Sequence, residues 1–192
     1  FDFRSSFLSD LVYDMLVLIT TETYNKMIAY LRDNSAISVN IPYENRETTM
    51  NNIVGFVEGK DITLPPLVLT AHFDHLGVDG DNNLYAGALD NASGTAFLLE
   101  LMRSYSSYSK PERNIIFAAL NAEEFGLLGS KSFADKNFEL IKNSQVINFD
   151  MIGSTGYPIT LMVGKSFSNK NSDLLNSIEN LAEKNNVKTR VV

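Results

Sequence analysis

Two adjacent acidic residues, Glu123 and Glu124, lie just beyond the apolar run 114–120. That run predicts a strand buried on both faces. Two like charges this close resist joint ionisation at the end of such a strand unless a cation compensates them. A divalent metal ion is the simplest partner. Because adjacent side chains leave the backbone in different directions, one carboxylate could bind the metal while the other transfers protons.

Other residues that could bind a metal also lie at the ends of predicted elements. His72 and Asp74 follow one apolar run, and Asp150 follows another. Asp90 precedes a predicted helix, whose first backbone N–H groups favour an anion. Ligands of open α/β sheets bind beyond the carboxyl ends of the strands. We therefore expect these side chains and the two glutamates to meet at one edge of the sheet.

Each of these residues also has a purely structural explanation. His72 could be a hydrogen-bonded residue at a strand end, and Asp90 could cap a helix. Asp150 could be an acid in a turn, and the two glutamates could begin a solvated helix, where acids favour the dipole. What favours a metal centre is the recurrence of such residues at the ends of several strands, rather than any one of them.

The elements that position these residues alternate between strands and helices. Short apolar runs predict strands, whereas apolar residues at helical spacing predict helices. This alternation indicates a three-layer α/β/α fold with a mixed, largely parallel central sheet. We expect one domain over 1–192, with an N-terminal helical segment (1–35) and an α/β core (36–192). The predicted strands are 37–41, 52–57, 67–71, 114–120, 145–149 and 159–163, and the predicted helices are 1–34, 93–108, 130–136 and one around 174–182.

Composition excludes several classes of function. The chain has 192 residues and a net charge of −7, which argues against nucleic acid as a partner. The absence of cysteine excludes thiolate metal sites and cysteine nucleophiles. With only two histidines, a metal centre must be mostly oxygen-ligated. No run approaches the ~20 apolar residues that a membrane span needs.

Four segments together resemble the successive motifs of the co-catalytic di-zinc aminopeptidases, the family typified by secreted bacterial leucine aminopeptidases. Glutamate carboxypeptidases and glutaminyl cyclases are its relatives. The resemblance covers roughly residues 50–165 and implies a zinc exopeptidase-like fold that binds two Zn²⁺ ions and acts on peptides. The segments are TAHFDHLG (70–77), GALDNASG (87–94), NAEEFGLLGS (121–130) and INFDMIGS (147–154).

The resemblance also implies the metal ligands. His72 and Asp150 would hold one zinc ion, Glu124 would hold the other, and Asp90 would bridge the two. The imidazole and the hydrolytic chemistry favour zinc over magnesium, although an oxygen-rich site also suits manganese or cobalt.

Two acids have catalytic rather than ligating roles in this pattern. Glu123 would be the general base, and Asp74 would orient His72. His75 has no role in the pattern, so we interpret it as a structural or rim residue.

The chain departs from the family pattern in one respect. The pattern has a further histidine, far beyond Asp150, that completes the second metal site, and no histidine follows His75 here. We expect a chain truncated at its C-terminal side, with an incomplete sheet. We also expect the site formed by His72, Asp90 and Asp150 to bind zinc, and the other site to bind it weakly or not at all.

The predicted function is a zinc-dependent metallo-aminopeptidase, a hydrolase that removes N-terminal residues from peptides. That the truncated chain is itself inactive is left open. The alternatives are a carboxypeptidase or cyclase activity within the family, or a non-catalytic binding module on a peptidase scaffold. By analogy with the family we expect a secreted, periplasmic or cell-envelope location, with a cytoplasmic one left open.

Overall fold

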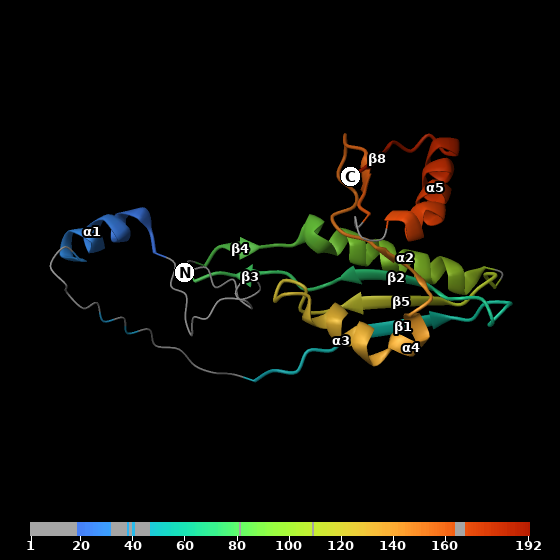
Figure 1. Ribbon diagram of the computed structural model, residues 1–192, viewed down its shortest axis with the longest axis horizontal. Helices are drawn as coiled ribbons and strands as arrows, with labels where there is room; N and C mark the ends of the chain where they lie inside the picture. Colours follow the sequence, from blue (N-terminus) through green and yellow to red (C-terminus); the bar gives the residue numbers. More distant parts are fainter. Residues whose placement is uncertain are drawn as a thin grey trace.

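The computed structural model describes residues 19–31, 38, 40, 47–80, 82–108, 110–163 and 168–192. At its centre lies a four-stranded sheet in the order β1–β5–β2–β6 (Figure 1). Strands β5, β2 and β6 are parallel, and β1 is antiparallel to β5. The mixed, largely parallel sheet predicted from the sequence is therefore confirmed. Its strands are β1 (Ile53–Val57), β2 (Leu67–His72), β5 (Ile115–Leu120) and β6 (Gln145–Asn148).

Helices cover both faces of this sheet, which gives the three predicted layers (Figure 1). Successive residues of a strand point to opposite faces. Ile115 and Phe117 of β5 belong to one core cluster with Leu98, whereas Ile116 belongs to a second cluster with Phe133. Leu98 lies on α2 (Gly94–Ser107), and Phe133 lies on α3 (Leu128–Lys136), which is followed by the short helix α4 (Phe138–Ile141).

The two central strands have the most continuous apolar sequences. In β2 every residue from Val68 to His72 is buried, and in β5 only Ala119 is partly exposed. Their parallel register pairs His72 with Leu120, so both strands end at the same edge. The residues that follow each strand are thereby brought together.

The last two predicted strands differ from expectation. We predicted 145–149 as a buried strand, but β6 lies at the end of the described sheet and its Val146 is 54% exposed. We predicted 159–163 as a further buried strand, but β7 (Ile159–Leu161) pairs in parallel with β8 (Thr189–Val191) in a separate two-stranded sheet. A short apolar run predicts a strand but does not determine its neighbours, so both predictions of burial were wrong.

The remaining elements confirm some predictions and add others. Helix α1 (Thr21–Leu31) lies within the predicted N-terminal helix but contains no buried residue. Helix α5 (Ser168–Lys184) confirms the final helix. The rest of the helix predicted over 1–34 and most of the strand predicted over 37–41 lie outside the described residues. Between β2 and α2 the chain forms a hairpin, β3 (Gly77–Val78) with β4 (Leu84–Tyr85), and then a helical turn, η2 (Ala88–Ser93). None of the helices in the described ranges is both long and apolar enough to cross a bilayer.

Candidate metal centre

The turns that leave β2, β5 and β6 bring the predicted ligands to one edge of the sheet. His72 is the last residue of β2, and Glu124 lies four residues beyond the end of β5. Asp150 lies two residues beyond β6, and Asp90 lies in η2 just before α2. The side chains form two groups whose ligand atoms lie within 4.8 Å of one another: His72, Asp90 and Asp150 in one, and His75, Asp90 and Glu124 in the other.

The imidazole of His72 is fixed by its surroundings. Its side chain is 3% exposed, and Nδ1 lies 3.1 Å from the backbone carbonyl oxygen of Asp74. Because a carbonyl oxygen can only accept, Nδ1 donates the hydrogen and Nε2 of the neutral ring carries a lone pair. That nitrogen lies 3.1 Å from Asp90 Oδ1 and 3.6 Å from Asp150 Oδ1. A metal ion or a proton between these atoms makes the contacts favourable, and an imidazole nitrogen with carboxylate oxygens is a donor set that suits a metal ion.

Asp74 orients the site through both its backbone and its side chain. We expected its carboxylate to orient His72, but the shorter contact to the ring comes from the Asp74 carbonyl; the carboxylate is 3.7 Å from Nδ1. The two carboxylate oxygens instead accept hydrogen bonds from the backbone N–H groups of Glu123 and Glu124, at 3.0 and 3.1 Å. Asp74 thus links the turn after β2 to the turn that carries both glutamates.

The turns beside the site acids contain strained backbone. Ala122 has φ 55° and Met151 has φ 50°, both in the left-handed region. This region costs a residue other than glycine about 1–2 kcal/mol. Ala122 precedes Glu123 and Met151 follows Asp150, so the strain lies where the chain turns away from the sheet. Such strain is typical of sites where the surrounding structure fixes a functional geometry.

Glu123 lies within electrostatic range of both groups. Burial raises the pKa of its carboxyl above the ordinary value, and the charges of Glu124, Asp150 and Asp74 raise it further, while His72 acts in the opposite direction. Glu123 is absent from both groups of candidate ligands. Its carboxylate is therefore a candidate for proton transfer rather than for metal binding.

Asn91 was not recognised in the sequence, yet it connects two of the ligands. Its side chain is 1% exposed. Nδ2 donates to the carbonyl oxygen of Phe149 at 3.0 Å, and Oδ1 accepts from the N–H groups of Gly94 at 3.0 Å and Met151 at 3.2 Å. One amide therefore joins the turn of Asp90 to the residues on both sides of Asp150. The only sequence signal was its position beside Asp90.

Close packing at Gly94 keeps these two segments together. A Cβ atom at this position would lie 2.4 Å from the carbonyl oxygen of Phe149 and 2.5 Å from Asn91 Oδ1. The absence of a side chain at Gly94 therefore permits the close approach of α2 to the turn after β6.

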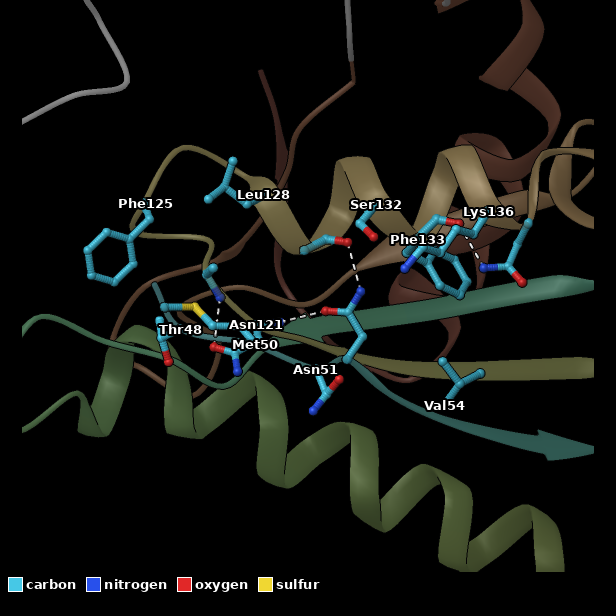
Figure 2. A pocket seen from close by; sticks show the side chains of 14 residues that line it. Thr48, Met50, Asn51, Val54, Asn121, Phe125, Leu128, Ser132, Phe133 and Lys136 are labelled. Atoms are coloured by element: carbon cyan, nitrogen blue, oxygen red, sulfur yellow. Dashed lines mark hydrogen bonds between the residues drawn. The ribbon is translucent and has the colours of Figure 1, made fainter. Parts of the chain in front are cut away.

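Asn52 also supports the turn of the two glutamates, through two side-chain hydrogen bonds. Its Oδ1 accepts from the backbone N–H of Asn121 at 2.9 Å, and its Nδ2 donates to the carbonyl oxygen of Gly129 at 2.8 Å. A cleft of about 770 Å³ opens beside this turn along α3, with Phe125 near one end and Lys136 near the other (Figure 2). Among the described residues that line it there is no predicted metal ligand, so the candidate site is the carboxylate cluster and not this cleft.

The residues present fit a zinc centre. Atoms that share a tetrahedral zinc ion lie roughly 3.3–3.6 Å apart, as follows from zinc–ligand distances of about 2.0–2.2 Å. The contacts of His72 Nε2, at 3.1 and 3.6 Å, lie close to this range. Imidazole combined with carboxylates suits zinc better than an all-oxygen site would. Asp90 belongs to both groups, as a bridging ligand must.

Comparisons with known proteins agree with the fold. The sequence profile of peptidase family M28 matches residues 52–191. Aminopeptidase YwaD of Bacillus subtilis is 39% identical over 110 residues, which are 56% of this chain and 23% of that protein. A vacuolar membrane protease of Kluyveromyces lactis is 42% identical over 105 residues, 54% of this chain and 10% of that protein. The match to the profile covers more than two thirds of the chain, which therefore belongs to peptidase family M28.

A solved structure supports the same fold. A leucine aminopeptidase precursor from Bacteroides thetaiotaomicron superposes with a TM-score of 0.58 and 22% identity, covering 73% of this chain and 57% of that one. At this identity the likeness concerns the fold, which is an aminopeptidase-like α/β fold. The chain spans less than a quarter of the length of the two curated relatives named above.

Proposed function

We propose that this chain carries the catalytic centre of a zinc-dependent exopeptidase that removes N-terminal residues from peptides. The observation that carries the proposal is the pair of ligand groups sharing Asp90, with the carboxylate of Glu123 close to both and belonging to neither. His72, Asp90 and Asp150 would hold one zinc ion, and Asp90 with Glu124 would hold the other. Bound zinc supplies Lewis acidity toward water and toward the scissile carbonyl.

In this proposal the chain's own residues position and move the proton. Glu123 accepts a proton from the attacking water on a carboxylate oxygen and delivers it to the nitrogen of the leaving amine as the C–N bond breaks. Asp74 holds the backbone N–H groups of both glutamates, which keeps Glu123 beside the reacting groups. In the metal-free chain burial raises the pKa of Glu123, which favours a carboxyl that can hold a proton.

The charge of the site favours a substrate with a free amino terminus. Five carboxylates lie here, from Asp74, Asp90, Glu123, Glu124 and Asp150, and ionised they carry −5. Two divalent ions contribute +4, and −5 + 4 leaves a formal −1. A residual negative charge attracts the ammonium group of a peptide's first residue and repels a terminal carboxylate.

The surroundings of the site favour an apolar side chain on that first residue. Five large apolar side chains that directly adjoin site residues in the sequence are 39–57% exposed, and so are available to a ligand. Exposed apolar side chains grouped near polar catalytic residues are typical of small-molecule and peptide sites. They are Phe73, Leu76, Leu89, Phe125 and Met151.

The test combines activity with metal content. The full-length wild-type chain should hydrolyse leucine p-nitroanilide faster than acidic dipeptides, and should not cyclise N-terminal glutamine. Glu123→Gln should lower kcat by about 10²–10⁴-fold with unchanged zinc content, because a general base is lost and no ligand is. Glu139→Gln, at a surface glutamate paired with Lys142, is the matched control.

Two outcomes would contradict the proposal. Full activity of Glu123→Gln would remove Glu123 from the mechanism. A wild-type chain that binds zinc but hydrolyses no peptide would favour a binding module on a peptidase scaffold. The secreted or cell-envelope location remains a prediction, which fractionation of the source cells would test.

A further inference from the structure

His75 lies where a ligand of the second ion would be. Its Nδ1 is 2.8 Å from Glu124 Oε1, and its ligand atom lies within 4.8 Å of those of both Glu124 and Asp90. The side chains of His75 and Glu124 are 21% and 18% exposed, so the pair is largely enclosed yet open to solvent on one side. The resemblance assigned His75 no role. Like His72, it belongs to a group with Asp90 and one further carboxylate, although its contact within 4.0 Å is with Glu124 alone.

The backbone before Asp90 is shaped around the His75 ring. A Cβ atom at Gly87 would lie 3.0 Å from His75 Cβ, from His75 Cδ2 and from the carbonyl oxygen of Asp90. Gly87 also has φ 66°, a conformation that favours glycine. The ring therefore packs directly against the turn that carries Asp90. This packing, rather than the acidic character of the cluster, fixes the imidazole within reach of both carboxylates.

From this geometry we propose that His75 is a metal ligand, the third protein donor beside Asp90 and Glu124 to the ion on the Glu124 side. The inference rests on the zinc dependence proposed above. It gives each ion one imidazole and two carboxylates, with Asp90 shared. A nitrogen and an oxygen on one tetrahedral zinc lie roughly 3.3–3.6 Å apart. Binding a shared ion therefore requires the His75–Glu124 contact of 2.8 Å to lengthen and the ligand atoms of His75 and Asp90, now within 4.8 Å, to reach this range.

The rival role is orientation: His75 could donate a hydrogen bond to Glu124 without touching the ion. Nuclear magnetic resonance of the full-length chain labelled with ¹⁵N-histidine and loaded with ¹¹³Cd²⁺ separates the two roles. A ring nitrogen bonded to ¹¹³Cd shows a coupling, whereas a nitrogen that only hydrogen-bonds to a ligand shows none. We expect coupling for His72 and for His75, each assigned by its disappearance in His72→Ala or His75→Ala.

Zinc affinity provides the second measurement. His75→Ala should weaken one of the two zinc equivalents by at least about 100-fold, beyond the 10–100-fold typical of residues that only orient a ligand. His75→Gln keeps an N–H donor for Glu124 but is a poor zinc ligand, so it should be as weak as His75→Ala. Val78→Ala, at an exposed residue of β3, is the control and should bind as the wild type does. Circular dichroism of the metal-free variants should match the wild type, which excludes misfolding as the cause.

The outcomes separate this inference from the proposed function. Two bound cadmium ions with no coupling at His75, or wild-type zinc affinity in His75→Gln, would overturn the ligand role and leave the zinc peptidase proposal intact. A wild-type chain that binds fewer than two ions would overturn both the inference and the two-metal form of the proposed function.

Discussion

Replacing Asn91 with alanine tests whether one buried amide holds the metal-binding turns together. Its three hydrogen bonds, to Phe149, Gly94 and Met151, are all made by a side chain that is almost fully buried. A typical intramolecular hydrogen bond contributes a net ~1 kcal/mol to stability. Three lost bonds therefore lower the free energy of unfolding by about 3 kcal/mol. For a chain of this size that corresponds to a fall in Tm of about 6–12 °C.

The assay is urea unfolding of the metal-free protein. Asn91→Asp keeps both acceptor interactions but places a buried carboxylate oxygen against the Phe149 carbonyl oxygen, so we expect a loss of stability at least as large as in Asn91→Ala. Asn185→Ala is the matched control, because its side chain makes a single exposed hydrogen bond to the Leu181 carbonyl. It should change the free energy of unfolding by less than about 0.5 kcal/mol.

Metal binding should follow stability in the same variant. Asn91 ties the turn of Asp90 to the residues flanking Asp150, so Asn91→Ala should weaken zinc binding at the group of His72, Asp90 and Asp150 by about 10–100-fold. If Asn91→Ala unfolded at the same urea concentration as Asn185→Ala and bound zinc as tightly as the wild type, the reasoning would be refuted.

Three further predictions concern other parts of the site. Gly129→Ala should lower the free energy of unfolding by about 2–3 kcal/mol in urea titrations, because its Cβ would lie 2.0 Å from the Asn121 carbonyl oxygen, whereas Gly80→Ala, with open space around it, should have little effect. Asp74→Ala should remove two charge-assisted hydrogen bonds to backbone N–H groups, lowering stability by about 3 kcal/mol and zinc affinity about 10–100-fold in calorimetry; unchanged values would show that the turn holds itself. Because the pKa of Glu123 is raised in the folded, metal-free protein, the folded state binds this proton more readily than the unfolded chain does. The contribution of the protonated Glu123 carboxyl to folding stability is therefore complete below about pH 4 and is lost as pH rises through the folded-state pKa. Glu123→Gln should raise Tm at pH 7 and not at pH 3.5, and an equal Tm at pH 7 would contradict this.

The sequence predicted the fold best where a continuous apolar run marks a buried strand and the connections between strands make neighbouring strands parallel. The runs that became β2 and β5 are continuously apolar, as central strands are, and the residues after them had to lie at one edge. Asp150 follows β6, which is parallel to β2, so the shared direction of the strands brings it to the same edge as His72. Their contacts with Asp90 in one group agree with the ligand set that the resemblance implied.

The sequence predicted least where a residue's role depends on a neighbour that is distant along the chain. The apolar residues of β6 and β7 resemble those of central strands, but exposure depends on strand order, which local pattern does not encode. Asn91 appears to sequence analysis as one more polar residue before a helix, because its partners lie about sixty positions later. His75 depends on the close packing of Gly87 against its ring, a contact that the His-x-Asp-His spacing does not reveal.

The membership of Asp90 in both ligand groups has a consequence for how the chain would fill with metal. Two ions that share a carboxylate cannot bind independently, and thermodynamic linkage requires each to alter the affinity of the other by the same factor. A half-loaded molecule is then a distinct chemical species, with its shared oxygen atoms already committed to one ion. Activity would depend nonlinearly on metal content, and loss of the single Asp90 carboxylate would disable both sites at once.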